Sequence, residues 1–129
     1  MREKLIKLLE NAYAPYSKFQ VASIVVTKNG QEFSGVNVEN CSYGAAVCAE
    51  RNAINSAISA GYKAGDFSKI YTMSSGQQLV QSCFICRQVI SEFFEEDAEV
   101  ITMLRDTDTT KSYLVKELCP HAFTKEHLS

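Results

Sequence analysis

The sequence contains no run of apolar residues long enough to cross a membrane, and its first residues, MREKLIKLLENAYA, carry charges among the leucines. We therefore expect neither a membrane-spanning helix nor a signal peptide. Only two prolines are present and 46% of the residues are hydrophobic, so extended disorder is not expected. The chain also lacks a surplus of positive charge, because its net charge is −2 at pH 7. That balance argues against a nucleic-acid partner.

The length of 129 residues predicts one domain, residues 1–129, that is large enough to bury its own core. Five cysteines are present, and an odd number does not form a complete set of disulfides. Because no secretory signal is expected, we expect a cytoplasmic protein whose thiols stay reduced. Closely spaced cysteines then favour metal binding or catalysis.

Apolar periodicity and turn residues predict an alternation of helices and strands. The expected helices are 2–14, 45–60, 83–94 and a short one within 116–129, and the expected strands are 19–27, 31–36, 69–73, 100–104 and 113–115. The acidic run EEDAE is expected at a solvated helix end. Helices interleaved with short buried strands predict an α/β fold, a three-layer α/β/α sandwich with a five-stranded mixed sheet between the helical layers.

Cys83 and Cys86 are three residues apart at the start of the third expected helix, so their thiols lie on one face and could hold one metal ion. The helix N-terminus would favour their thiolate forms, and Ser82 is the expected N-cap residue. By itself this C-x-x-C pattern is a weak signal. A redox pair and two ordinary core cysteines remain alternatives.

Cys48 lies in the expected first turn of another helix and is followed by Glu50 and Arg51. A C-x-E pattern combined with C-x-x-C is far more specific for a catalytic zinc site, which has three protein ligands and leaves the fourth position open. A carboxylate that does not bind the metal can transfer protons beside it. Three thiolates give zinc a net negative charge, so positive potential from Arg51 and two helix N-termini would be needed to activate water.

Further motifs extend this pattern over nearly the whole chain: AYAPYSKFQVA, GVNVENCSYG, VCAERNA, CRQVISEF and LCPHAF. Their kind and order resemble the small homotetrameric zinc-dependent cytidine deaminases of the cytidine/deoxycytidylate deaminase superfamily. The resemblance implies a cytidine deaminase-like fold, one Zn²⁺ per subunit and a homotetramer. The implied reaction is hydrolysis of cytidine and deoxycytidine to uridine and deoxyuridine, with release of ammonia, in pyrimidine salvage.

The resemblance also implies roles for individual residues. Cys48, Cys83 and Cys86 would be the zinc ligands. Glu50 would move protons from water to ring N3 and the departing nitrogen, and Arg51 would hydrogen-bond the cysteine sulfurs. The implied substrate contacts are Phe19 beside the base, Ala49 at the base edge, Asn37 and Glu39 at the ribose 3′-hydroxyl, and Tyr43 and Phe123 across subunit boundaries.

Several of these positions also have plain structural interpretations. Asn37 lies in a turn-rich loop where asparagine commonly serves the backbone, and Glu39 there would be solvated. Phe19 opens a strand pattern typical of a core residue, Phe123 would anchor the tail, and Arg51 would be a solvated charge. The other cysteines and histidines are expected to have no metal role: Cys41, Cys119, His121 and His127.

The chain departs from the family pattern beside the metal cysteines. Ser82 stands where the family has proline, and Phe84 stands where it has glycine. Phe84 would be strained if the family glycine has a positive φ angle, and would only fill space if that position is helical. The family's V-G-A after the aromatic residue is Val21-Ala22-Ser23 here.

Other functions remain open on the sequence. Blasticidin S deaminases share the zinc core but act on a modified nucleoside, whereas the Asn37-x-Glu39 pair favours a plain ribose. Polynucleotide deaminases need a basic channel, which the acidic balance does not provide. Two interpretations without catalysis also remain, a non-catalytic zinc-binding module and a deaminase fold that has lost activity and serves as an interaction subunit. A structural zinc site normally closes with a fourth protein ligand, and only three cysteines fit here.

Overall fold

The computed structural model describes residues 1–128, so Ser129, the last residue of the expected tail, lies outside the described residues. The helices are α1 (Arg2–Leu9), α2 (Ala49–Ser59), α3 (Phe84–Phe93) and α4 (Val115–Leu118), with 3₁₀ turns η1 (Tyr43–Ala45) and η2 (Lys125–Leu128). The strands are β1 (Val21–Thr27), β2 (Glu32–Val36), β3 (Phe67–Ser74), β4 (Phe94–Leu104) and β5 (Thr110–Leu114). None of the helices in this part of the chain is long and apolar enough to cross a membrane.

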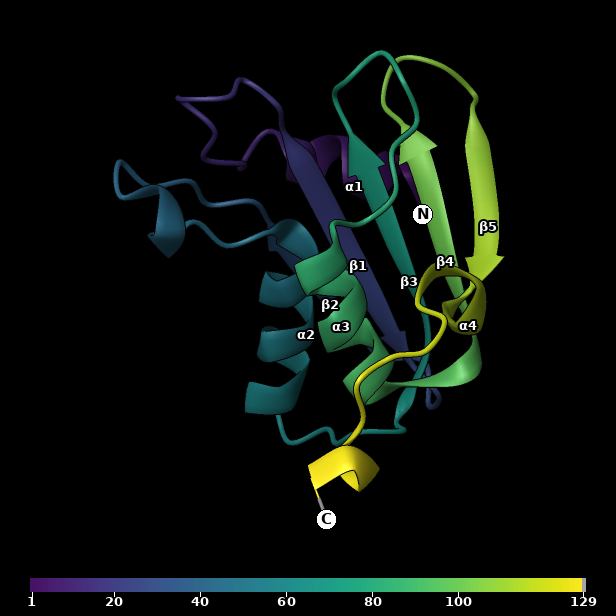
Figure 1. Ribbon diagram of the computed structural model, residues 1–129. Helices are drawn as coiled ribbons and strands as arrows, with labels where there is room; N and C mark the ends of the chain where they lie inside the picture. Colours follow the sequence, from purple (N-terminus) through teal and green to yellow (C-terminus); the bar gives the residue numbers. More distant parts are fainter. Residues whose placement is uncertain (129) are drawn as a thin grey trace.

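The strands form one mixed sheet in the order β2-β1-β3-β4-β5 (Figure 1). β1 is antiparallel to both β2 and β3, β3 is parallel to β4, and β4 is antiparallel to β5. The predicted five-stranded mixed sheet is therefore confirmed. Because β2 and β3 both oppose β1, they run in the same direction and end at the same edge of the sheet. The chain enters α2 after β2 and enters α3 after β3, so this topology brings the two helix N-termini together.

Two apolar clusters fill the two faces of the sheet and confirm the three-layer arrangement. Leu5 and Leu9 of α1 pack on one face against Ala22, Ile24 and neighbouring side chains of the sheet. The other helices cover the opposite face, and Figure 1 shows α1 behind the sheet with α2 and α3 in front of it. Their cluster is built from Val25, Ala53, Ile54, Ala57, Phe67, Ile70, Ile90, Phe94, Ala98, Val100, Val115 and Leu118. β1 is buried on both faces, as its apolar composition predicts.

The prediction for the acidic run EEDAE was wrong. α3 ends at Phe93, and residues 95–99 belong to β4, which begins at Phe94 and runs parallel to β3. Ala98 and Val100 alternate with exposed acidic residues and point into the core, which is the period of two typical of a strand. Glu95 also forms an ion pair with Lys28, so part of the acidic charge is neutralised.

The first helix is shorter than the expected range 2–14. α1 ends at Leu9, and Tyr13 then pairs with Val38 in an isolated parallel bridge. Tyr13 N donates to Asn37 O at 3.0 Å, and Glu39 N donates to Tyr13 O at 2.8 Å. These two hydrogen bonds fix the loop after β2 against the segment that leads into β1.

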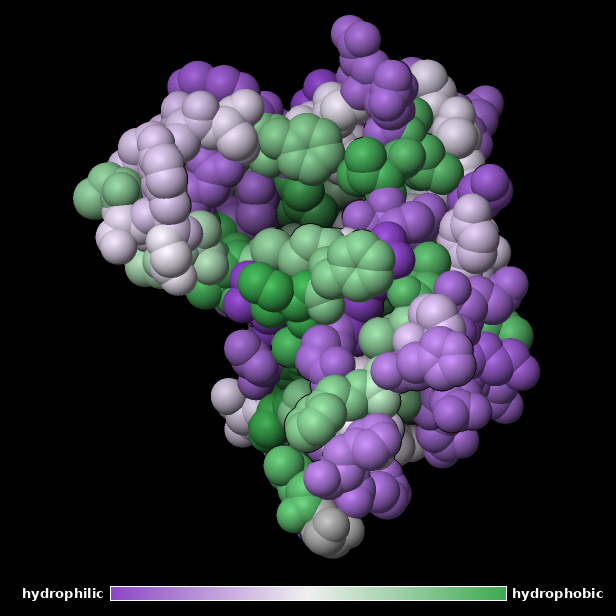
Figure 2. Space-filling view, in the orientation of Figure 1, coloured by the Kyte–Doolittle hydropathy of each residue, from purple (hydrophilic) through white to green (hydrophobic). Residues whose placement is uncertain are grey.

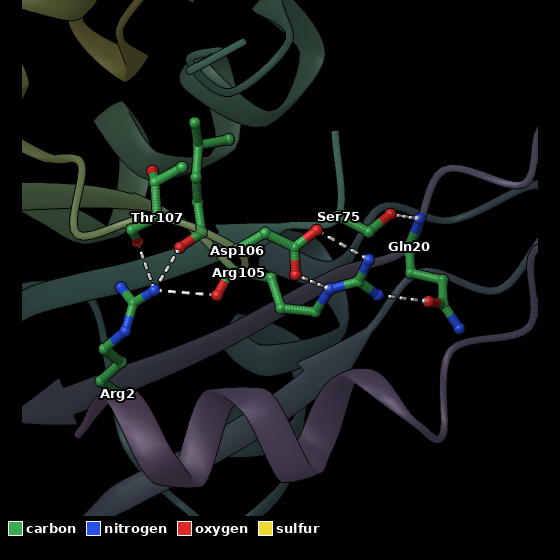
Figure 3. A network of polar contacts seen from close by, with 7 residues as sticks. Arg2, Gln20, Ser75, Arg105, Asp106 and Thr107 are labelled. Atoms are coloured by element: carbon green, nitrogen blue, oxygen red, sulfur yellow. Dashed lines mark hydrogen bonds and ion pairs between the residues drawn. The ribbon is translucent and has the colours of Figure 1, made fainter. Parts of the chain in front are cut away.

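A network of hydrogen bonds connects the loops that follow β3 and β4 with α1 and the segment before β1 (Figure 3). Arg2 donates hydrogen bonds to the carbonyl oxygens of Leu104 at 2.7 Å and Arg105 at 2.9 Å. Arg105 in turn donates to the Gln20 side chain at 3.4 Å, and Gln20 N donates to Ser75 Oγ at 2.9 Å. The segment before β1 is thereby tied to the loops that follow β3 and β4.

Candidate functional site

Three thiols meet where α2 and α3 begin. Cys48 is the N-cap residue of α2, Cys83 is the N-cap residue of α3, and Cys86 lies in the first turn of α3. All three Sγ atoms lie within 4.8 Å of one another, and the Sγ atoms of Cys48 and Cys83 are 3.9 Å apart. The topology of the sheet, rather than proximity in sequence, creates this cluster.

The cluster has the geometry of a zinc site. Tetrahedral zinc with Zn–S bonds of about 2.3 Å requires sulfur atoms about 3.8 Å apart, close to the separation of Cys48 and Cys83. Thiolates are preferred zinc ligands, and both helix N-termini direct positive potential toward them. Among residues 1–128 no further histidine, cysteine or carboxylate joins the group, so the three sulfurs leave one coordination position open.

Arg51 lies next to the sulfurs. Its Nη2 donates to Cys48 Sγ at 3.5 Å, and the side chain is partly buried. Hydrogen bonding to the neighbouring Cys86 thiol is the largest cause that lowers the pKa of Cys48, to about 5. Hydrogen bonds from Arg51 and Cys83 lower it further, and burial acts in the opposite direction. The pKa of Cys86 is raised, chiefly because its thiol hydrogen-bonds Cys48. The cluster therefore holds at least one thiolate near neutral pH, and Arg51 is not simply a solvated charge.

A cavity of about 280 Å³ opens beside the thiols. Besides metal cysteines, five of its lining residues were predicted as site residues: Phe19, Asn37, Glu39, Ala49 and Glu50. Cys48 and Cys83 line the same cavity, whereas Cys86 is fully buried behind them. The structure thus brings the metal cluster and most of the predicted substrate contacts together.

Glu50 is buried in this cavity, with only 4% of its surface exposed. Desolvation raises the pKa of its carboxyl group, while the nearby Ser82 hydroxyl and backbone act in the opposite direction. A carboxyl group held beside an open metal position, away from bulk water, can accept a proton from water and deliver it to a bound ligand.

Asn37 and Glu39 are both fixed before any ligand binds. Asn37 Oδ1 accepts from Val21 N at 2.9 Å, and its Nδ2 donates to Phe19 O at 2.8 Å. Glu39 Oε1 accepts from the backbone N–H groups of Tyr16 at 3.0 Å and Ser17 at 3.1 Å. The Ser17 hydroxyl also donates to Glu39, and this contact is the main cause of the lowered pKa of Glu39. Asn37 therefore does serve the backbone, and it also lines the cavity.

Phe19 precedes β1 instead of opening it, and its ring lines the cavity. Gly76 packs against this ring, since a Cβ atom at position 76 would lie 2.6 Å from Phe19 Cε2. The adjacent Gln20 and Ser75 are joined by the network in Figure 3. The loop that follows β3 therefore packs against the Phe19 ring through Gly76.

Tyr43 and Phe123 do not reach the cavity of their own chain. Tyr43 is 80% exposed and packs edge-on against Tyr16, where the two rings line a separate surface hollow. Phe123 is 57% exposed and stacks on His127 near the C-terminus. Their predicted contacts would need a second subunit.

The prediction that Ser82 caps α3 was wrong. The Cys83 thiol accepts a hydrogen bond from Cys86 N at 3.5 Å and is the capping group, whereas Ser82 is buried and lines the cavity. Cys48 is the N-cap residue of α2 instead of lying within its first turn, but its thiol makes no capping hydrogen bond. The helix expected from residue 83 begins one residue later, and the helix expected from residue 45 begins four residues later, at Ala49. The sequence had no signal for either shift, because both interpretations keep the cysteines at the helix start.

Phe84 is the first helical residue of α3 and does not have a positive φ angle. Its ring is 74% exposed and lies 4.3 Å from the Arg87 guanidinium. Arg87 Nε also donates to Ser82 O at 2.7 Å, and Nη1 donates to Leu118 O at 3.2 Å. Phe84 is therefore unstrained, and it covers an arginine that fixes the backbone just before the metal cysteines.

Sequence reasoning missed other cavity residues. These are Ser17, Val21, Thr72, Ser74, Val80, Gln81, Ser82 and Met103. Thr72 and Ser74 are buried hydroxyl residues of β3, but this strand also contains Ser68 and Lys69, so polarity alone did not single them out. The others depend on how the loop after β3 folds over the sheet.

Comparisons with known proteins give a consistent result. Residues 1–103 match the family described as the cytidine and deoxycytidylate deaminase zinc-binding region. The chain is 40% identical over 131 residues to a probable cytidine deaminase of Dictyostelium discoideum, covering 98% of this chain and 86% of that one. It is 37% identical over 127 residues to a cytidine deaminase of Halalkalibacterium halodurans, covering 98% and 94%.

A crystal structure of a cytidine deaminase from Burkholderia pseudomallei has the same fold. The TM-score is 0.86 at 38% identity, and the match covers 95% of this chain and 99% of that one. A blasticidin-S deaminase of Bacillus cereus is a more distant relative, 30% identical over 131 residues that cover 95% and 86% of the two chains.

Proposed function

The chain belongs to the cytidine and deoxycytidylate deaminase family, and we propose that it hydrolyses cytidine and deoxycytidine to uridine and deoxyuridine with release of ammonia. The observation that carries this proposal is a three-thiol zinc site, open at its fourth position, with a buried carboxyl group in the adjoining cavity. Neither a structural zinc site nor a dithiol redox pair requires such a carboxyl group.

In this proposal Cys48, Cys83 and Cys86 hold one zinc ion per chain, and Arg51 stabilises the sulfur charge. When bound, zinc would supply the Lewis acidity that makes water nucleophilic near neutral pH. Glu50 would take one proton from the attacking water and deliver it to ring N3. It would then move the second water proton to the amino nitrogen, so that ammonia leaves and C4 keeps a carbonyl oxygen. Its burial keeps competing solvent away from this transfer.

Phe19 would flank the pyrimidine ring, and the Ala49 backbone would contact the edge of the base. Asn37 and Glu39 would bind the ribose 3′-hydroxyl. Glu39 already accepts three hydrogen bonds, which leaves about one of its four lone-pair sites for a ligand. Because these contacts fix both side chains in advance, little conformational entropy would be lost when the sugar binds.

We further propose that the chain acts as a single domain and assembles as a cytoplasmic homotetramer. Exposed apolar side chains support an assembly, because large apolar patches are unusual on monomers. Phe84 and Ile85 lie at the N-terminal end of α3, where Figure 2 shows apolar side chains gathered in the middle of the molecular face. Tyr43 and Phe123 would complete the cavities of neighbouring subunits.

The direct test is ammonia release from cytidine, deoxycytidine and blasticidin S by protein of measured zinc content. Turnover of cytidine and deoxycytidine, with little or none of blasticidin S, is the expected result. Protein that carries one zinc per chain and leaves both cytidine nucleosides unchanged would contradict the proposal.

Blasticidin-S deamination is the second candidate. The more distant relative from Bacillus cereus supports it, as does the surface hollow beyond Glu39, which is lined by Tyr16 and Tyr43 and could take a larger substituent. Preferential turnover of blasticidin S in the same assay would favour this candidate over a plain nucleoside.

A further inference from the structure

The Ser82 hydroxyl is a buried polar group without a hydrogen-bond partner among the described residues. Ser82 is only 4% exposed, and its Oγ atom is fully enclosed. It lines the cavity together with Glu50 and lies close enough to influence that carboxyl group, yet the two do not reach hydrogen-bonding geometry. A buried hydroxyl left in this way costs about 1–3 kcal/mol of stability, so its partner has to be sought outside the chain.

Two other buried hydroxyl groups, in the sheet, are satisfied within the fold. Ser23 Oγ donates to Tyr71 O at 2.8 Å and lies 3.1 Å from Thr72 Oγ1. Thr102 Oγ1 accepts from Gln81 Nε2 at 3.1 Å. Ser82 differs from Ser23 and Thr102 because it lines the cavity without a partner, so a ligand in the cavity is the nearest group that could supply one.

The backbone around Ser82 is firmly held. Its carbonyl oxygen accepts from Arg87 Nε at 2.7 Å, and Arg87 is anchored in turn to Leu118 O at 3.2 Å. The next residue, Cys83, caps α3 and belongs to the thiol cluster. The backbone that carries the hydroxyl is therefore fixed next to Glu50 and the thiol cluster.

We propose that the Ser82 hydroxyl is a hydrogen-bond site for the exocyclic amino group of the pyrimidine. The inference rests on the proposed function, in which this nitrogen must come within reach of Glu50 to receive a proton. A serine hydroxyl oxygen accepts hydrogen bonds, so Ser82 can accept one from the amino group. Substrate binding then gives the Ser82 hydroxyl the partner that the described residues do not supply.

Binding of two ligands to a catalytically inactive protein tests this contact. Zinc-loaded Glu50→Gln protein is titrated with cytidine and with pyrimidin-2-one ribonucleoside, which is identical except for hydrogen in place of the amino group. Adding Ser82→Ala is expected to weaken cytidine binding three- to tenfold, as expected for one lost hydrogen bond, and to change binding of the analogue less than twofold. Ser82→Thr keeps a hydroxyl and should keep cytidine affinity.

Thermal unfolding separates this role from a structural one. With Glu50 intact, Ser82→Ala should leave Tm unchanged or raise it, because it removes an unsatisfied hydroxyl. The matched variant Ser23→Ala breaks two existing hydrogen bonds, so it should lower Tm and leave the ratio of the two ligand affinities unchanged.

Three results would overturn the inference. Equal weakening of both ligands by Ser82→Ala would show that Ser82 does not recognise the amino group. Unchanged cytidine affinity would show that only a trapped water satisfies the hydroxyl, and absent cytidine binding with Ser82 intact would contradict the contact outright. Failure of the proposed function is separate, because it would appear as no cytidine turnover by the protein with Glu50 intact.

Discussion

Glu50 is buried like a core residue, yet it lines the cavity where water and substrate would meet the metal. Desolvation raises its pKa, which moves the carboxyl group toward the range where it can both accept and release a proton. No other carboxyl group in the described chain is buried in this way. At the scale of single residues, the proposed chemistry therefore depends on Glu50.

Replacing Glu50 with glutamine should retain one zinc per chain and reduce cytidine turnover by about 10²–10⁴-fold, because the amide keeps the shape but does not shuttle protons. Ammonia release and metal analysis on the same preparation measure both quantities. Cys86→Ala serves as the contrasting variant, because it should lose zinc and turnover together. Glu50→Gln protein that keeps near-normal turnover would refute the assigned role.

Arg51→Ala should weaken zinc retention, because Arg51 Nη2 donates to Cys48 Sγ and stabilises the sulfur charge. Loss of a hydrogen bond to a metal ligand typically costs about 10- to 100-fold in metal affinity. Competition with a zinc chelator measures the change, and Arg51→Lys, which keeps the charge without the planar fork, should lie in between. Wild-type zinc retention and turnover rate in Arg51→Ala would show that the Arg51–Cys48 hydrogen bond does not stabilise the zinc site.

Residue-level patterns in the sequence had unequal predictive value. The spacing of Cys48, Glu50, Cys83 and Cys86 was sufficient to expect one cluster, and the structure brings these residues to one place. The unpartnered Ser82 hydroxyl could not be expected, because it depends on the shift of the helix cap to Cys83. Whether Phe84 is strained depended on a φ angle that sequence does not encode.

The packing of α2 on β2 positions Cys48 and Glu50. Gly35 lies so close to α2 that an added Cβ would overlap Ala53 N and lie 2.6 Å from Ala49 O. Asn52 Nδ2 also donates to Val36 O at 2.8 Å, which fixes the rotation of the helix against the strand. The absence of a side chain at position 35 therefore allows the start of α2, with Cys48 and Glu50, to pack closely against β2.

Gly35→Ala should lower the free energy of unfolding by about 1–3 kcal/mol, because overpacking forces the helix and strand apart. It should also lower turnover, since Cys48 and Glu50 move with the helix. Chemical denaturation and the ammonia assay measure the two effects. Gly44→Ala is the matched control, because a Cβ there meets nothing within 4 Å. Equal stability of the two variants would contradict the close-packing argument.

Element-level prediction succeeded where periodicity was unambiguous. The hairpin at Lys28-Asn29-Gly30 formed as expected, with Gly30 at a φ of +88°. The acidic residues of β4 misled the prediction, because exposed glutamates suit a helix end as well as one face of a strand. Pairing with β3 decides between these alternatives, and such long-range pairing is not visible in a local window.

At the scale of the whole molecule, the α/β fold and its mixed sheet were predictable because helices alternate with buried strands. The meeting of two helix N-termini was not predictable by this route, since it requires β2 and β3 to lie on either side of β1. Whether the cavity has all of its predicted substrate contacts also depends on the whole assembly. Tyr43 and Phe123 reach it only if another subunit supplies them.

Native mass spectrometry should therefore give a mass close to four chains of 14.4 kDa. Phe123→Ala should raise the KM for cytidine even though Phe123 lies outside the cavity of its own chain, because its ring would complete a neighbouring site. A monomer with full activity, or an unchanged KM in the variant, would argue against shared sites.

The central claim is that a three-thiol zinc site and Glu50 together deaminate cytidine. The most direct measurement is the rate of ammonia release from cytidine while zinc is added back stepwise to chelator-treated protein. The rate should rise in proportion to bound zinc and level off at one zinc per chain, and Glu50→Gln protein should bind the same zinc without the rise. Full zinc occupancy without ammonia release, or release that does not depend on zinc, would contradict the account.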